Sequence, residues 1–290
     1  MEYSIRNDEL QLVLSDIGAE LQSVQKDGRE YLWNANPQYW PEHSPLLFPC
    51  VGRFTDGKYR LNGREYEMEI HGFARKCFYH VAEKEAEKIT FELRDSAETY
   101  QIYPYHFILW VTYQLKNNTI QITYRVCNDS PDTMYFGIGG HPGFRVPLDE
   151  RLTFSDYCLE FSGMSFPERI GHTPACFLSG IDKEFPLEDH RILRLSHEMF
   201  DQDAIVLRNM ADEVTLKSEK GTRQVTVSYP HMPYLGLWHA PRTEAPYICI
   251  EPWTSLPSRQ DIVEEWKYKS DLIRLASRKQ YVNTWSITIR

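Results

Sequence analysis

Hydrophobic and polar residues alternate along most readable segments of this chain, a pattern that predicts β-strands. Residues 111–115 and 120–126 alternate strictly on the two sides of a short polar segment that contains Asn117 and Asn118. Two segments with a period of two around such a turn predict a β-hairpin. The same alternation predicts further strands at residues 9–14, 205–207, 222–229 and 284–289.

Helical periodicity is nearly absent, and only the short segment 262–266 approaches it. Strands without intervening helices pair antiparallel and stack as a sandwich or barrel, because parallel sheets need crossover helices. The chain contains no linker, fixed-period repeat or low-complexity tract. We therefore predict an all-β fold, a large antiparallel β-sandwich, with one domain spanning residues 1–290.

The composition is that of a globular protein, with 42% hydrophobic and 25% charged residues. Aromatic residues reach 13%, a high share that suits sheets and sites that stack flat ligands. The chain has 32 Lys+Arg against 41 Asp+Glu and no basic tract. Nucleic acid is therefore not a predicted partner, because its binding depends on phosphate neutralisation. A phosphorylated metabolite stays possible, since one local pair of arginines suffices for it.

Neither a membrane segment nor a secretion signal is visible. No apolar stretch reaches the ~18 residues of a membrane helix, and the N-terminus lacks a basic region followed by an apolar one. The closest pair of the six cysteines is 18 positions apart, so no CxxC metal or redox motif exists. We predict a cytoplasmic monomer or homodimer with reduced thiols.

Two glycine-rich segments each surround a histidine. In residues 71–75, Gly72 follows His71 and allows close backbone approach and an exposed imidazole, although a solvated turn would look the same. In residues 137–144, four glycines and Pro142 surround His141. Such a rigid backbone suits an imidazole that must hold one orientation for proton transfer, the alternative being a plain loop. Pro142 replaces the third glycine of a GxGxxG motif, which disfavours a dinucleotide site.

A carboxylate candidate follows the apolar segment 247–250. Glu251 precedes Pro252 there, so we expect it at the end of a strand. Trp253 would shield the carboxylate and raise its pKa, as a general base requires, whereas a surface residue at a loop start is the plain alternative. His71, His141 and Glu251 could bind a metal by residue type, but their spacing matches no compact metal motif.

In this order, the three segments resemble the aldose 1-epimerase (galactose mutarotase) family, and in particular its LacX-like branch. The similarity extends to residues 14–21 and 48–53, so it covers nearly all of the chain. The His-Pro-Gly-Phe sequence at 141–144 is its most specific element. The resemblance implies a large antiparallel β-sandwich with a broad open cleft, in agreement with the alternation.

The resemblance also implies roles for individual residues. Glu251 would be the general base and His141 the general acid of a mutarotase, which opens and closes a sugar ring and thereby interconverts its α and β anomers. A neutral-pH enzyme of this kind needs a protonated His141, which the negative charge of Glu251 would favour. The implied substrate-binding residues are His71, Arg53, Arg75 and Asp203, with Trp238, Trp253 and Phe144 as possible aromatic platforms.

The substrate itself stays open. Asp56-Gly57 replaces an Asn-Arg pair of the galactose mutarotases, and His71-Gly72-Phe73 replaces a longer His-Gly-Gly motif. A free hexose is the leading expectation, with a hexose-6-phosphate held by Arg53, Arg75 and Arg145 as the alternative. A third possibility is a non-catalytic protein that binds or senses carbohydrate. The mutarotase chemistry requires neither a metal nor another cofactor.

Overall fold

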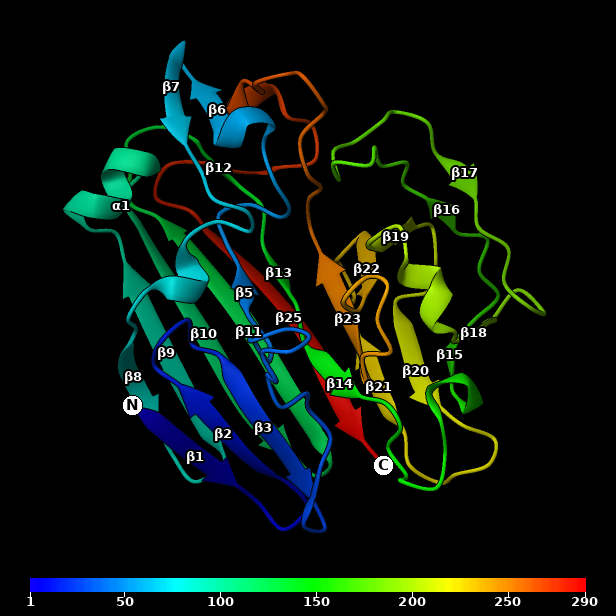
Figure 1. Ribbon diagram of the computed structural model, residues 1–290. Helices are drawn as coiled ribbons and strands as arrows, with labels where there is room; N and C mark the ends of the chain where they lie inside the picture. Colours follow the sequence, from blue (N-terminus) through cyan, green and yellow to red (C-terminus); the bar gives the residue numbers. More distant parts are fainter.

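The computed structural model describes residues 1–290, and antiparallel strands build its two large sheets (Figure 1). The first sheet has nine strands, in the order β18 (Ile192–Arg194), β15 (Cys158–Phe161), β20 (Glu213–Lys217), β21 (Val225–Ser228), β25 (Gln280–Ile289), β11 (Thr119–Asn128), β10 (Phe107–Lys116), β9 (Lys88–Arg94) and β8 (His80–Lys84). The predicted all-β architecture is confirmed.

The second large sheet carries the strands that later define the site. Its order is β17 (Lys183–Glu184), β16 (Glu168–Arg169), β19 (Ile205–Arg208), β22 (Tyr234–Trp238), β23 (Tyr247–Trp253), β13 (Gly139–Gly140) and β5 (Leu46–Leu47), with β14 (Gly143–Arg145) also paired to β23. The smaller sheets are β1 (Glu2–Arg6), β2 (Gln11–Ser15), β3 (Leu21–Lys26) and β4 (Arg29–Glu30); β6 (Lys58–Leu61) and β7 (Arg64–Glu67); and β12 (Met134–Phe136) and β24 (Ile273–Leu275).

Helices contribute little, as the missing helical periodicity predicts. The α-helix α1 (Ala97–Ile102) begins after Ser96, whose side chain accepts a hydrogen bond from the Thr99 backbone N–H. The other helical segments are 3₁₀ turns, namely η1 (Thr55–Gly57), η2 (Ala74–Lys76), η3 (Phe154–Asp156), η4 (His197–Phe200) and η5 (Trp266–Tyr268).

The predicted hairpin forms from β10 and β11. Lys116 pairs with Thr119, so that Asn117 and Asn118 make a two-residue loop. Asn117 has a φ of 53°, the positive value that asparagine tolerates in such turns. The other predicted strands also form, except that the segment predicted at 222–229 becomes a strand only from Val225.

The four-stranded sheet packs on β9 and β10 of the large sheet (Figure 1). The rings of Tyr3 and Phe91 meet edge to face at 5.8 Å, and the Tyr113 hydroxyl donates a hydrogen bond to the Ala19 carbonyl at 2.9 Å. This contact closes one half of the sandwich.

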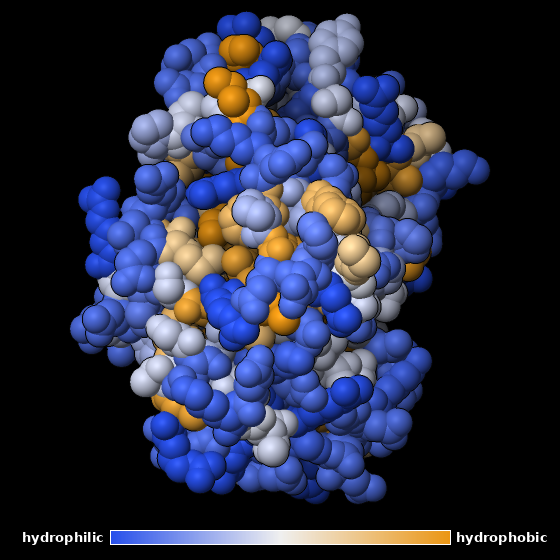
Figure 2. Space-filling view, turned by 90° about the vertical axis from the view of Figure 1, so that its right-hand side faces the viewer, coloured by the Kyte–Doolittle hydropathy of each residue, from blue (hydrophilic) through white to orange (hydrophobic).

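The eight-stranded sheet closes the other half by close approach to β25. A Cβ atom on Gly140 of β13 would lie 2.6 Å from the Trp285 indole of β25. The largest cluster of buried hydrophobic residues, 65 in all, extends from Ile5 to Ile289, so both ends of the chain share one core. Figure 2 views the molecule from the β16–β17 side, where apolar side chains gather near the middle of a mostly hydrophilic surface.

The structure corrects the expected position of Glu251, which lies inside β23 rather than at its end. It pairs with Gly236 of β22, and the strand continues through Pro252. The N–H groups of Ile250 and Thr254 point to the β13–β14 side, so the Pro252 nitrogen points there too. The neighbouring chain is interrupted between β13 and β14 at this point, so the missing N–H of proline breaks no ladder bond.

No helix of the chain is both long and apolar enough to cross a membrane. All six cysteines are free.

Candidate active site

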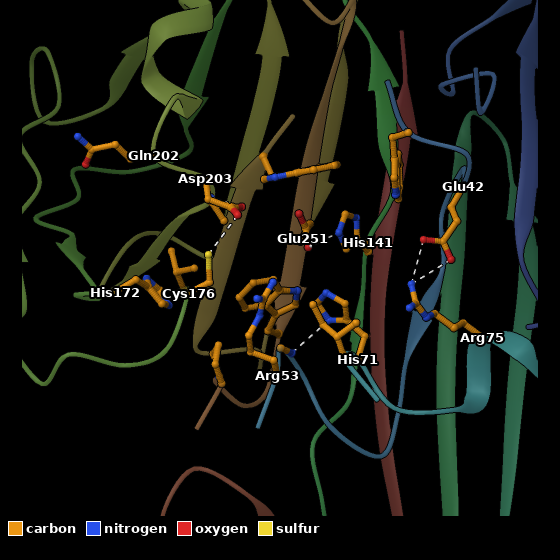
Figure 3. Close-up of a pocket in the computed structure, with 18 residues that line it drawn as sticks. Glu42, Arg53, His71, Arg75, His141, His172, Cys176, Gln202, Asp203 and Glu251 are labelled. Atoms are coloured by element: carbon orange, nitrogen blue, oxygen red, sulfur yellow. Dashed lines mark hydrogen bonds and ion pairs between the residues drawn. The ribbon is translucent and has the colours of Figure 1, made fainter. Parts of the chain in front are cut away.

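One cavity of about 310 Å³ brings together most of the residues that the sequence assigned to a site (Figure 3). Its lining includes Arg53, His71, Arg75, His141, Asp203, Trp238 and Glu251. Pockets of this size that combine apolar walls with a few convergent polar groups are typical ligand sites.

At the centre of the cavity, Glu251 and His141 face each other. The interruption between β13 and β14 places His141 opposite Glu251, because Gly139 pairs with Trp253 and Gly143 with Cys249. The Nε2 atom of His141 lies 3.2 Å from Oε2 of Glu251. Only 1% of the Glu251 surface and 8% of the His141 surface are exposed. β13 thus ends at Gly140 and β14 begins at Gly143, and His141 lies in the gap between the two strands.

Aromatic rings enclose the pair. Trp40 stacks on the His141 imidazole with centroids 4.8 Å apart, and Trp238 meets the same imidazole edge to face at 5.8 Å. Trp40 and Trp238 also meet each other edge to face at 5.6 Å. These indoles exclude water from the pair, which lowers the local dielectric and favours neutral forms.

Burial shifts the pKa values of Glu251 and His141 in the directions that favour their uncharged forms. It raises the pKa of Glu251 well above the ordinary glutamate value, and the nearby Asp203 carboxylate adds to the effect. Burial lowers the pKa of His141 below the ordinary histidine value, and Arg75 adds to that shift. Both directions run against the expectation that the charge of Glu251 helps His141 to keep its proton, because burial penalises the imidazolium as well as the carboxylate.

His71 lies beside this pair, with its ring edge to face against that of His141 at 5.6 Å. The Nδ1 atom of its ring accepts a hydrogen bond from the Gly52 backbone N–H at 3.1 Å. The backbone N–H of His71 donates to the Gly52 carbonyl at 2.8 Å. In the neutral ring, the proton must therefore sit on Nε2. Burial and the charge of His141 lower the pKa of His71, which keeps this neutral tautomer.

Close packing explains the glycine that follows this histidine. Gly72 has a φ of +73°, and a Cβ atom there would lie 2.2 Å from the Phe48 carbonyl oxygen. Gly52 has a φ of +71°, and its Cβ atom would lie 2.4 Å from the Pro257 ring. Only glycine fits either position. The segments that contain Gly52 and Gly72 therefore pack closely, which restricts the orientation of His71.

The arginines differ in their partners. Arg75 binds both carboxylate oxygens of Glu42 through Nη1, at 3.0 and 2.9 Å, so its charge is largely compensated. Arg53 lines the cavity without an ion pair. Arg145 lies exposed on β14 and does not line the cavity. The three-arginine clamp expected for a phosphorylated hexose is therefore not assembled.

Asp203 lines the cavity as expected, whereas the neighbouring Asp201 does not. The Oδ2 atom of Asp203 accepts a hydrogen bond from the Cys176 thiol at 3.1 Å. Burial, with Asp203 as its neighbour, raises the pKa of Cys176 to about 11, so the thiol stays protonated and can donate.

Two of the three expected aromatic platforms line the cavity. Trp238 and Trp253 contribute to its wall, and Gly236 leaves room for the Trp253 indole, since a Cβ there would lie 2.7 Å from the ring. Phe144, in contrast, is fully buried in the main hydrophobic core. It cannot be a sugar platform, because its side chain points into the sandwich.

Several polar atoms of the cavity are buried without a hydrogen-bond partner. They are Oε2 of Glu251, Nδ1 of His141, Nε1 of Trp253 and Nε of Arg75. Unsatisfied buried groups cost free energy and are rare in folded proteins, so their concentration in one cavity indicates that a polar ligand completes them.

Among the polar and aromatic residues of the cavity wall, sequence reasoning missed five: Trp40, Glu42, His172, Cys176 and Gln202. They come from segments far apart in the chain and lie in no recognisable motif. Only the tyrosine, tryptophan and proline sequence at 39–41 could have hinted at a ligand-contacting loop. Sequence reasoning also missed Cys249, which together with His141 and Glu251 offers ligand atoms within 4.8 Å of one another.

Known proteins of similar sequence and structure identify the class. A family model described as Aldose 1-epimerase matches residues 1–284. The chromosomal LacX protein of Lactococcus lactis subsp. lactis is 33% identical over 296 residues, which cover 97% of this chain and 98% of that protein. The structure of a galactose mutarotase related enzyme from Lactobacillus acidophilus has a TM-score of 0.95 and 34% identity, covering 100% of this chain and 97% of that one.

A galactose mutarotase-like protein from Lactobacillus casei also has a TM-score of 0.95, at 30% identity and with 100% of both chains covered. The β-sandwich is therefore of the galactose mutarotase-like kind. The chain belongs to the aldose 1-epimerase family, as its motifs predicted. Members of this family are isomerases, and the general role of the protein is that of a mutarotase or epimerase.

Proposed function

We propose that the protein interconverts the α and β anomers of a free hexose or related aldose by acid–base opening and closure of the ring. The observation that carries the proposal is the Glu251–His141 pair, buried at 3.2 Å in a cavity of about 310 Å³. A carboxyl and an imidazole at this distance supply the base and the acid that a hemiacetal requires. The unpartnered polar atoms around them match the hydroxyl groups of a sugar.

Ring opening follows from the positions of these groups. The Glu251 carboxylate takes the proton of the anomeric hydroxyl, the C1–O5 bond breaks, and O5 receives its proton from the His141 imidazolium. The aldehyde then rotates about C1–C2, and the reverse transfers close the ring on the other face. Each such transfer typically accelerates a reaction by ~10²–10⁴-fold.

The buried pair fits this cycle. The open-chain sugar stands beside a protonated Glu251 and a neutral His141, which is the state that burial favours. The charged pair that starts ring opening arises by transfer of one proton across the 3.2 Å contact. Burial thus favours the uncharged Glu251–His141 pair that accompanies the open-chain intermediate. The charged pair that starts ring opening must be stabilised by hydrogen bonds to the sugar hydroxyls.

The surrounding residues then bind the ring. The Nε2–H group of His71 is free to donate to a sugar oxygen, and Arg53 can donate to hydroxyls. Trp238 and Trp253 offer apolar faces, and Asp203 offers an acceptor. The cavity lies at the small end of typical ligand pockets, which suits one pyranose. The six free thiols support a cytoplasmic location.

Polarimetry tests the proposal directly. Freshly dissolved α-glucose and α-galactose should reach their equilibrium rotation faster with the protein than in protein-free buffer at the same pH. Sugar binding without any acceleration would instead establish a non-catalytic carbohydrate-binding protein. Calorimetric titration with each sugar supplies the binding measurement.

The fall of kcat/KM on the acidic side of its pH profile is expected well below pH 6.5, the ordinary histidine pKa, because burial lowers the pKa of His141. The pair carries one proton between the lowered pKa of His141 and the raised pKa of Glu251. Activity should fall only at pH well below 6.5, where a second proton removes the base, and above the raised Glu251 pKa, where no proton is left for the acid. Initial rates, corrected for the protein-free reaction, give the profile. A fall of kcat/KM on the acidic side centred at pH 6.5 would contradict this prediction.

Replacing His71 by asparagine is expected to raise KM more than it lowers kcat. Asparagine can place its Oδ1 where Nδ1 accepts from the Gly52 N–H, but it has no atom that reaches as far as Nε2, so the donor to the sugar is lost. The variant therefore weakens binding of the ring without removing the acid or the base. Michaelis parameters from polarimetry check this split, with His80→Asn on exposed β8 as the control. A loss confined to kcat would assign His71 to the proton transfers.

Chelator treatment is expected to leave the activity unchanged. His141, Cys249 and Glu251 converge, but burial raises the pKa of both Cys249 and Glu251 and keeps them in neutral forms that bind metals poorly. Polarimetric rates before and after EDTA dialysis test this. Loss of activity with EDTA and its recovery with a divalent ion would establish a metal enzyme.

A further inference from the structure

A second groove adjoins the cavity and is continuous with it. The two share His172, Gln202 and Asp203 in their walls. The groove encloses about 900 Å³ and contains no Phe, Tyr or Trp side chain. In Figure 3, His172 and Gln202 lie on the opposite side of Asp203 from Glu251. A sugar with its anomeric carbon at Glu251 would therefore point its other end toward this groove.

The groove carries cations that the protein leaves unpaired. Arg169 of β16 lies directly opposite Lys183 of β17 in the strand register, and both line the groove. Like charges that face each other across strands are destabilising. The neighbouring Arg208 is served by two carboxylates, Glu168 at 2.7 Å and Asp182 at 3.0 Å. No carboxylate lies within ion-pair distance of Arg169 or Lys183, so their repulsion is uncompensated.

A third cation, Arg242, also lines the groove without an ion pair. Arg169 is half-buried, and this burial lowers the pKa of its guanidinium, whereas Lys183 is exposed at the rim. Two carboxylates line the groove as well, Asp201 and Asp203. Asp203 is already engaged with the Cys176 thiol. Three cations against two carboxylates thus line the groove, in a protein whose net charge is -9.

We propose that this groove binds an anionic substituent of the sugar, a phosphate monoester or a carboxylate, at the end remote from the anomeric carbon. The inference rests on the proposed ring-opening chemistry and makes an anionic derivative, rather than the free hexose, the preferred substrate. A phosphate or carboxylate between Arg169 and Lys183 would replace their repulsion by charge-assisted hydrogen bonds. A second neutral sugar ring fits less well, because the groove offers no aromatic face on which to stack it.

Substrate comparison is the first test. Mutarotation of glucose, glucose 6-phosphate, glucuronic acid and maltose separates a neutral ring, two anionic substituents and a second neutral ring. We expect KM to be about tenfold lower for at least one anionic sugar than for glucose, the effect of one charge-assisted hydrogen bond. The two anionic arms distinguish phosphate from carboxylate. Rising salt should raise KM for the anionic sugars only. A preference for maltose would overturn the proposal.

Charge-removing variants are the second test. In Arg169→Gln and Lys183→Gln, KM for the preferred anionic sugar should rise about tenfold more than KM for glucose. Arg274→Gln, at the exposed position of β24 and without an ion pair, is the matched control and should change neither. Equal effects on charged and neutral sugars would overturn the groove assignment while leaving the mutarotase proposal intact.

Binding separates the two proposals if no sugar is turned over. Calorimetric titration with glucose 6-phosphate, glucuronic acid and glucose does not depend on catalysis. Tighter binding of an anionic sugar that is lost in Arg169→Gln would support the groove even where mutarotation fails. Equal affinity for the three sugars would overturn it.

Discussion

Replacing Glu251 by glutamine is expected to abolish most turnover while the sugar still binds. Glutamine keeps the shape of the side chain at the centre of β23, but it cannot accept the proton of the anomeric hydroxyl. Loss of one positioned base typically costs ~10²–10⁴-fold in rate. The loss should appear in kcat measured by polarimetry, whereas calorimetric affinity for the sugar should change little.

The same substitution has an independent signature in stability. Burial raises the pKa of Glu251 in the folded protein, so above the ordinary glutamate pKa the folded state holds a proton that the unfolded state releases. The contribution of Glu251 to the stability of the wild-type protein therefore falls as pH rises through this window. Glu251→Gln removes this contribution, and its melting temperature should gain on the wild type as pH rises from about 4.5.

Two observations would contradict this assignment. Near-wild-type turnover in Glu251→Gln would remove the carboxyl from the mechanism. A drop in both turnover and melting temperature at every pH would indicate misfolding rather than loss of the base. Glu244→Gln, which removes an exposed carboxylate of the β22–β23 connection, serves as the matched control.

Replacing His141 by asparagine is expected to lower kcat nearly as much. The imidazole is the group within 3.2 Å of Glu251 that can receive its proton and pass it to the ring oxygen. Asparagine cannot be protonated at neutral pH, so the ring would open without an acid. Part of the loss arises from position, because the imidazole also stacks on Trp40 at 4.8 Å.

A double-mutant cycle separates the proton transfer from packing. If Glu251 and His141 act as one acid–base unit, Glu251→Gln with His141→Asn should cost about as much as either change alone. Independent roles would instead multiply the two losses. Polarimetric kcat values of the four proteins decide between them, and near-ultraviolet circular dichroism verifies that the aromatic cage around Trp40 is retained.

Local sequence patterns were sufficient for the strands and the motifs. The β10–β11 hairpin depends on alternation and on an Asn-Asn turn, both of which act over a few residues. The glycines beside His71 and within 137–144 also act locally, because a positive φ or a close backbone contact excludes other residues. Such short-range constraints are visible in a single sequence, and they sufficed to indicate Glu251, His141 and His71.

Long-range packing decided the rest. Trp40, Glu42 and Cys176 reach the cavity from segments without a motif, since the sheets, not the sequence spacing, bring them together. The same packing placed Phe144 in the core and Arg145 outside the cavity, although both adjoin the histidine motif. One position along a strand turns a side chain to the opposite face, so neighbours in sequence need not share a site.

The sequence by itself thus determined which groups carry the chemistry, while the tertiary structure decided their protonation and their surroundings. Residue type alone favoured a charged His141 beside a charged Glu251. The enclosing indoles of Trp40 and Trp238 reverse this expectation, because burial penalises both charges. The unpaired cations Arg169 and Lys183 became visible only when the register of β16 and β17 set them opposite each other, since the pairing of strands is a property of the whole sheet.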